Sequence, residues 1–160
     1  MDIKVEDDEV SEEEAIQSIK QILEKNKLLS MSTVEETSPH INTAFFTHQD
    51  LKLYIFTPPD TIHGKNLDKN PEVAVDVHDS HQEWTDDKKG LQIFGKAEIQ
   101  NTQEVLDLYC ERFPEMKELA SDQKELDQYD SEFYVIKPER IKIFDEPRFG
   151  TENWINVVIN

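Results

Sequence analysis

The chain has 160 residues, 35 of them acidic and 17 basic, with a net charge of −18 at neutral pH. This length fits a single domain, residues 1–160, built around one core. A strongly negative surface repels phosphate backbones, which argues against nucleic acid as a partner, and we attribute the acidity to solubility or to a high-salt environment.

The sequence also argues against a membrane partner and favours the cytoplasm. Residues 1–10 lack the apolar core of a signal peptide, and we expect them to be disordered. No apolar run approaches the roughly 20 residues of a membrane span. The one cysteine, Cys110, cannot form an internal disulfide, which fits a reducing compartment.

Periodic patterns predict helices and strands in alternation. One helix follows a capping box at Ser11 and Glu14, and another is capped by Thr102. Strands are predicted at residues 28–34, 40–47, 51–57, 72–78, 90–100, 132–137 and 140–145. About six or seven short strands with two or three flanking helices predict a mainly β fold, a small antiparallel barrel. Residues 121–131 are interpreted as a polar loop.

Glycine in the middle of a predicted strand indicates how the barrel closes. The strand at 90–100 alternates apolar and polar residues, and Gly95 lies on its apolar side. A glycine there predicts a bend or bulge. The tail at 155–159 is apolar and, with outward-facing phenylalanines, predicts a surface that another subunit covers.

The segment 51–77 carries the strongest chemical signal. Two prolines stop the strand that ends at Thr57, and Asp60 or Thr61 then caps a short helix. His63 and Lys65 lie in the first turns of that helix. Hydroxyls, an imidazole and an ammonium near a helix N-terminus predict an anion site, usually for phosphate. The alternative is that His63 packs in the core and Lys65 is simply solvated.

Other sites are excluded or interpreted as structural. Four glycines are too few and too scattered for a Rossmann fingerprint or a P-loop, and no G-x-S-x-G motif is present. Cys110 lies in an amphipathic helix and is interpreted as a packed thiol. His78 and His81 are spaced too loosely for a metal site, and none is predicted. Arg148 is interpreted as a salt-bridge residue, with a ligand contact as the alternative.

Ordered motifs from about residue 28 to residue 99 carry a resemblance to a known family. They are M-S-T-V-E-E-T-S-P-H-I-N-T-A-F-F, then L-Y-I-F-T-x₃-T-x₃-K-N-L-x₂-N-P-x-V-A-V, then W-x₆-L-Q-I-F-G-K-A-E. The chain resembles the pyridoxamine 5′-phosphate oxidase-like superfamily of FMN-binding split β-barrels. Within it, the chain is similar to a short uncharacterised branch that shares an R-F-P after the second helix and a late F-G.

The resemblance implies a homodimer with one FMN at each of two interface sites. Backbone groups of the second strand would lie along the isoalloxazine, and the end of the third strand with the following helix would hold the phosphate. The resemblance therefore assigns cofactor binding to Asn42, Thr43, Ala44, Phe45, Phe56, Thr57, Thr61, His63, Lys65 and Gln92. It assigns no catalytic residue.

One departure from the family pattern bears on function. Where the oxidases carry two consecutive basic residues, this chain has Ile62 and His63, and Lys65 follows two residues later. The arginine-rich C-terminal substrate signature is absent, so pyridoxamine phosphate oxidase activity itself is not expected. Three functions remain open: an FMN-dependent oxidoreductase of unknown small-molecule substrate, a non-catalytic flavin- or haem-binding stress or storage protein, and a cofactor-free dimeric module.

Overall fold

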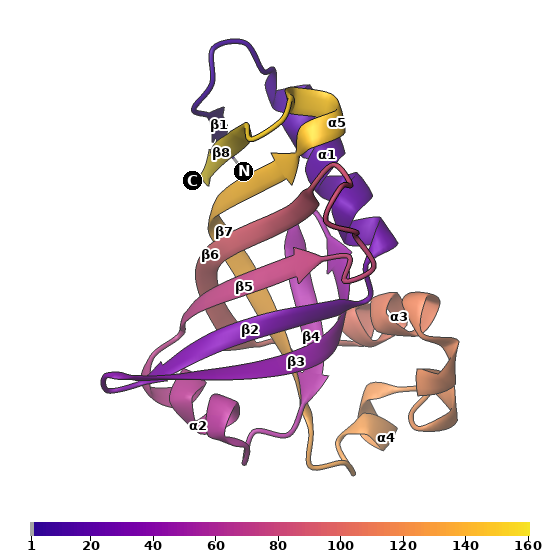
Figure 1. Ribbon diagram of the computed structural model, residues 1–160. Coiled ribbons are helices and arrows are strands. Elements are labelled where there is room, and N and C mark those ends of the chain that lie inside the picture. The colour runs from indigo at the N-terminus through magenta and orange to yellow at the C-terminus, as the bar shows by residue number, and fades with distance from the viewer. Residues whose placement is uncertain (1) are drawn as a thin grey trace.

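The computed structural model describes residues 2–160, and its strands form a closed antiparallel barrel (Figure 1). Strands β2 to β7 close the barrel because β7 pairs with both β4 and β6. The strands are β1 (Ile3–Val5), β2 (Leu28–Glu35), β3 (Ser38–Gln49), β4 (Lys52–Thr57), β5 (Glu72–His78), β6 (Lys89–Ile99), β7 (Glu132–Asp145) and β8 (Trp154–Ile159). The predicted mainly β barrel with flanking helices is confirmed.

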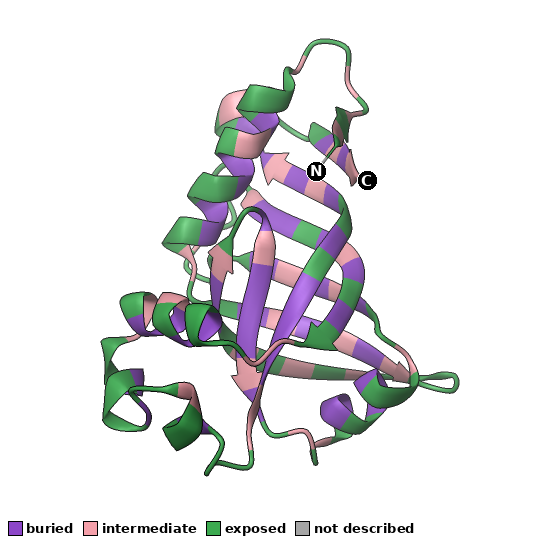
Figure 2. Cartoon of the chain, turned by 180° about the vertical axis from the view of Figure 1, so that it is seen from behind, coloured by how far each residue is buried: buried purple, intermediate pink, exposed green. Residues whose placement is uncertain are grey.

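Helices cover the outside and one end of the barrel. They are α1 (Glu12–Lys25), α2 (Ile62–Lys69), α3 (Gln103–Arg112), the 3₁₀ helix η1 (Pro114–Glu118), α4 (Gln123–Leu126) and α5 (Glu146–Phe149). The capping box of α1 forms as predicted, and its buried side faces the barrel (Figure 2). The short helix α4 lies within the segment interpreted as a loop. Within residues 2–160, no helix has the length and apolar character needed to cross a membrane.

Two apolar clusters stabilise this arrangement. The larger one fills the barrel and includes Ile19 and Leu23 of α1. The second lies outside the barrel, where Leu106 of α3 packs against Phe133 and Val135 of β7. Cys110 belongs to this second cluster and is buried, as expected for a packed thiol.

The two predicted strands at 132–137 and 140–145 are one continuous strand, which corrects the prediction. β7 runs through Pro138 without ending, and both of its halves pair with β6. The pairing register of β6 and β7 shifts beside Gly95, where β7 has one extra residue that forms a bulge. The bulge allows β7 to continue through Pro138. The predicted bulge at Gly95 is therefore confirmed, and it lies where the prediction divided β7 into two strands.

Both ends of the chain depart from prediction. Residues 3–5, expected to be disordered, form β1 and pair with β8. The apolar tail expected to need a cover forms β8, pairs with β7 and buries Ile155 and Val157. The tail is covered within the chain and gives no support for a dimer.

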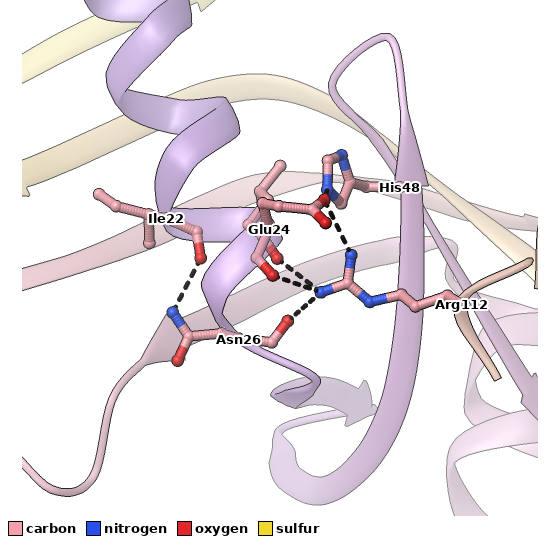
Figure 3. A network of polar contacts seen from close by, with 6 residues as sticks. Ile22, Glu24, Asn26, His48 and Arg112 are labelled. Atoms are coloured by element: carbon pink, nitrogen blue, oxygen red, sulfur yellow. Dashed lines mark hydrogen bonds and ion pairs between the residues drawn. The ribbon is translucent and has the colours of Figure 1, made fainter.

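Arg112 connects α3 to the end of α1 (Figure 3). Its guanidinium donates hydrogen bonds to the carbonyls of Leu23, Glu24 and Asn26 at 2.9, 3.1 and 2.5 Å. These carbonyls lie at a helix C-terminus, where they lack partners within the helix. Arg112 thus fixes α1 relative to the second cluster. Arg148 forms an ion pair with Asp145 at 3.4 Å, as its structural interpretation predicts.

Candidate functional site

The connection between β4 and α2 is built by Thr61 and Gly64. The Thr61 hydroxyl accepts a hydrogen bond from the Gly64 N–H at 3.2 Å and donates one to the Pro58 carbonyl at 2.8 Å. A Cβ at Gly64 would lie 2.2 Å from the Pro59 carbonyl oxygen, so only glycine allows the loop to approach so closely. Thr61 is therefore the N-cap of α2, one of the two residues predicted for that position, and its hydroxyl is occupied by the cap hydrogen bonds.

His63 lies on the buried side of α2. Its Nε2 is 2.8 Å from the Thr57 hydroxyl, and its ring stacks on that of His40, with ring centroids 6.2 Å apart. Burial lowers the pKa of His63, and the neighbouring His40 lowers it further. Since the ordinary pKa of histidine is near 6.5, His63 is neutral at neutral pH.

Lys65 lies on the opposite, exposed side of the same helix. Its ammonium forms an ion pair with Asp60 at 2.6 Å, and both side chains are largely exposed. The hydrogen bond from Lys65 lowers the pKa of Asp60. The two predicted basic positions thus diverge: His63 faces the barrel, and Lys65 faces solvent at the first turns of α2.

Strand β3 has no strand partner along the first part of one edge. It pairs with β2 along Ser38–Phe45, but with β4 only along Phe46–Gln49, because β4 turns away and crosses behind it (Figure 1). The backbone from Ser38 to Phe45 therefore has an open edge on the side that β4 leaves. This is the split in the barrel, and α2 lies beside it.

In an antiparallel strand, the backbone N–H and C=O groups of successive residues point alternately to the two edges, which determines which residues of β3 have free groups at the open edge. The N–H of Phe46 bonds the Lys27 carbonyl on the β2 side, so backbone groups of Phe45, Thr43 and Ile41 point the other way. The Tyr109 hydroxyl donates to the Phe45 carbonyl at 3.3 Å from that side. The amide and carbonyl groups of Ile41 and Thr43 thus face the split.

The predicted cofactor residues of β3 divide between two roles. Thr43 and Phe45 have backbone groups at the open edge, whereas the backbones of Asn42 and Ala44 belong to the ladder with β2. The Ala44 side chain packs on the barrel core, and Asn42 Oδ1 is buried with no hydrogen-bond partner in residues 2–160. Phe56, also predicted, packs on Phe133 with ring centroids 4.8 Å apart.

Gln92 lies apart from the rest of the predicted site. It projects from the outer face of β6 and borders a shallow hollow of about 310 Å³, hereafter the sheet hollow. The sheet hollow is lined by Ser30, Ser32, Ile41, Ala74, Val75, Asp76, Gln92 and Phe94. In the order β3-β2-β5-β6, three strand spacings separate Gln92 from β3, which is about 14 Å. Within one chain, Gln92 does not reach the open edge of β3.

Two residues of this region were not predicted. Ile41 has backbone groups at the open edge and a side chain that is 68% exposed at the sheet hollow. His40 stacks on His63. Pro39 has no N–H for the ladder with β2, so its backbone faces the split. Counting every second residue from Pro39 could have identified Ile41 as another residue whose backbone faces the split, and His40 as one whose backbone does not.

Comparison with known proteins defines the class. The sequence model of the family described as pyridoxamine 5′-phosphate oxidase matches residues 15–145. The chain belongs to this family, and the predicted superfamily is confirmed. The name describes the family and does not by itself give this chain a substrate.

Individual relatives are distant. General stress protein 26 of Bacillus subtilis is 26% identical over 98 residues, which span 61% of this chain and 69% of that protein. The haem storage protein HutZ of Vibrio cholerae is 22% identical with a TM-score of 0.63, over 77% of this chain and 89% of that one. A haem-binding protein of Mycobacterium smegmatis is 14% identical with a TM-score of 0.70, over 93% and 59%. At these identities, the two structures share the fold.

Burial of His63 predicts a pH-dependent stability. Because its folded pKa lies below the unfolded value, the unfolded chain takes up a proton first as the pH falls through about 6.5. His63→Gln keeps a hydrogen-bonding group beside Thr57 but has no titration in this range. We expect its free energy of unfolding to fall less than that of the wild type between pH 7.5 and pH 5.5, as measured by urea denaturation.

The control for this prediction is Ile62→Gln, which places the same amide on the exposed neighbouring position. It should keep the pH dependence of the wild type. Equal losses in wild type and His63→Gln would show that burial of His63 does not disfavour its protonation.

Proposed function

We propose that the chain is an FMN-binding oxidoreductase acting on a small-molecule substrate. The observation that carries the proposal is the open edge of β3 beside the N-terminus of α2. Free amide and carbonyl groups of Ile41 and Thr43 suit the hydrogen-bonding edge of an isoalloxazine. When bound, FMN supplies the electron-transfer chemistry, and the protein supplies binding, orientation and electrostatics.

The phosphate end has suitable donors. The N–H groups of Ile62 and His63 belong to the first turn of α2 and have no acceptor within the helix. The Thr57 hydroxyl lies beside His63. Lys65 can exchange its pairing with Asp60 for a phosphate at little cost, because ion pairs between exposed side chains contribute little to stability. The residues present fit an FMN phosphate, with fewer formal charges than two basic side chains would give.

A homodimer completes this site. Gln92 lies about 14 Å from the open edge of β3 in its own chain, so the contact assigned to it would come from Gln92 of the partner subunit. Exposed apolar side chains support such an interface on the outer face of β2 and β3: Leu28 (48%), Ile41 (68%) and Phe45 (55%). The lone, buried Cys110 supports a reducing compartment such as the cytoplasm.

The absorption spectrum of the purified protein tests this function. We expect a flavin spectrum at once, or after FMN is added and the excess removed. His63→Ala with Lys65→Ala should weaken FMN binding about ten-fold or more, the effect of losing one charge-assisted hydrogen bond. Lys69→Ala, in the last turn of α2, is the matched control and should bind like the wild type.

A protein that stays colourless after FMN addition would reject the proposal and leave a cofactor-free module. Retention of affinity in the double variant would instead place the phosphate elsewhere. Rapid reduction of the bound flavin by a nicotinamide cofactor, followed by reoxidation, would favour catalysis over storage.

Haem is the second candidate ligand, for a storage or stress function. The observation that favours it is the stacked pair His40 and His63, since a neutral imidazole can bind haem iron. His63 also stands at a position where the oxidases carry a basic residue. Two relatives of similar fold are described as haem-storing or haem-binding. Titration with haem should give a sharp Soret band that His40→Ala or His63→Ala weakens, whereas His81→Ala should leave it unchanged.

A further inference from the structure

A strip of cations and aromatic rings crosses the outer faces of β6, β7 and β8. The guanidinium of Arg140 lies over the Phe94 ring, 4.5 Å from its centroid. The ammonium of Lys142 lies 4.3 Å from the Trp154 ring and 5.1 Å from the Phe144 ring. Arg140 and Lys142 are two residues apart on the same face of β7, so their positions are about 7 Å apart along the strand.

These two cations are held by rings and not by carboxylates. The other two arginines of the chain have acidic partners, Glu24 for Arg112 and Asp145 for Arg148. Arg140 and Lys142 form no ion pair with any carboxylate in residues 2–160. A ring orients a cation without using its N–H groups, so the donors of both side chains remain available to a ligand. In a chain of net charge −18, such a strip concentrates anions locally.

The strip borders the sheet hollow. In the strand register, Gln92 lies opposite Lys142, and Phe94 lies opposite Arg140. Both Gln92 and Phe94 line the sheet hollow, which therefore offers an apolar floor and an amide beside two oriented cations. The one carboxylate of the hollow, Asp76, is two strands from Lys142 and forms a hydrogen bond with His78. An anion at the strip is thus two strand spacings from Asp76, and Glu139, the residue before Arg140, is paired with Lys96 at 2.8 Å.

We propose that Arg140 and Lys142 bind the phosphate or carboxylate of a small molecule whose planar, apolar part lies in the sheet hollow. The two cations of this site are separate from the α2 site proposed for FMN phosphate. The sheet hollow shares Ile41 and Gln92 with the proposed dimer interface and flavin contact, so in that dimer the ligand would lie beside the bound flavin. Two cations at this spacing suit a pair of anionic groups or a pyrophosphate, because an arginine fork binds two oxygens and a lysine a third. If the chain acts on a flavin, the site would select anionic substrates or reductants.

Binding of NADPH and of inorganic pyrophosphate to the purified protein, measured by titration calorimetry, tests the site. We expect NADPH to bind more tightly than pyrophosphate, because its rings can occupy the sheet hollow. Arg140→Ala with Lys142→Ala should weaken both ligands about ten-fold or more. Arg140→Lys with Lys142→Arg, which keeps both charges, should retain most of the affinity.

The matched control is Lys117→Ala with Lys124→Ala, which removes two exposed cations that lie away from the strip. It should bind both probes like the wild type, which separates a local site from a change in net charge. Absence of binding by both probes, or equal affinity in the Arg140 and Lys142 double-alanine variant, would overturn the proposal. Pyrophosphate binding as tight as NADPH binding would overturn the role of the hollow.

Discussion

Replacing Gly95 with alanine is expected to lower the free energy of unfolding by about 3 kcal/mol, the upper part of the usual range for overpacking a core. A Cβ at this position would lie 2.1 Å from the Lys137 carbonyl oxygen and 2.9 Å from the Pro138 Cα. Both are backbone atoms, so rotation of a side chain cannot relieve the overlap. The overlap forces β6 and β7 apart at the bulge where the barrel bends.

Thermal unfolding followed by circular dichroism measures this effect. For a chain of this size, a loss of about 3 kcal/mol corresponds to a fall in Tm of about 6 to 12 °C. Gly90→Ala is the matched control on the same strand, because its Cβ would lie 3.1 Å from the nearest atom, the His78 Cβ. We expect it to change the free energy of unfolding by about 1 kcal/mol or less. Similar losses in both variants would show that the close approach at Gly95 is not what stabilises the bend.

Gly95 also illustrates what the sequence could predict of the fold. Local patterns are sufficient for the α1 capping box and for β5, because each depends on residues close in the chain. Gly95 alone indicates a bulge but not the strand opposite it. The pairing partners are not local. From the sequence alone, Pro138 predicts the end of a strand, because the bulge opposite Gly95 is not visible there. Residues 3–5 are likewise predicted to be disordered, because their pairing with β8 cannot be predicted locally.

The candidate site shows the same limit at the level of single residues. The sequence predicts a cap at Asp60 or Thr61 and the positions of His63 and Lys65 on one short helix, and the structure has Thr61 as the cap and both residues on α2. The structure agrees with the alternative that His63 packs inward, but the sequence does not predict its partners Thr57 and His40, which come from other elements. Nor does it show where along β3 the split begins, because that depends on how far β4 stays paired.

The proposed interface makes the largest functional prediction. Ile41→Asp is expected to convert a dimer into a monomer and to weaken FMN binding about 100-fold, since a charge buried at the centre of an apolar interface costs several kcal/mol. The Ile41 side chain is 68% exposed in the single chain, so the substitution should leave the folded monomer intact. Light scattering gives the mass, and flavin fluorescence gives the affinity.

Leu119→Asp provides the matched control for Ile41→Asp. Leu119 is 51% exposed and follows η1, on the side of the barrel that α3 covers, so the same charge there should leave both mass and FMN affinity unchanged. Loss of the dimer without loss of FMN would show that one chain holds the cofactor by itself, and that Gln92 of the partner subunit is not required. A wild-type monomer at micromolar concentration would remove the interface altogether, and the open edge of β3 would then have to bind its ligand alone.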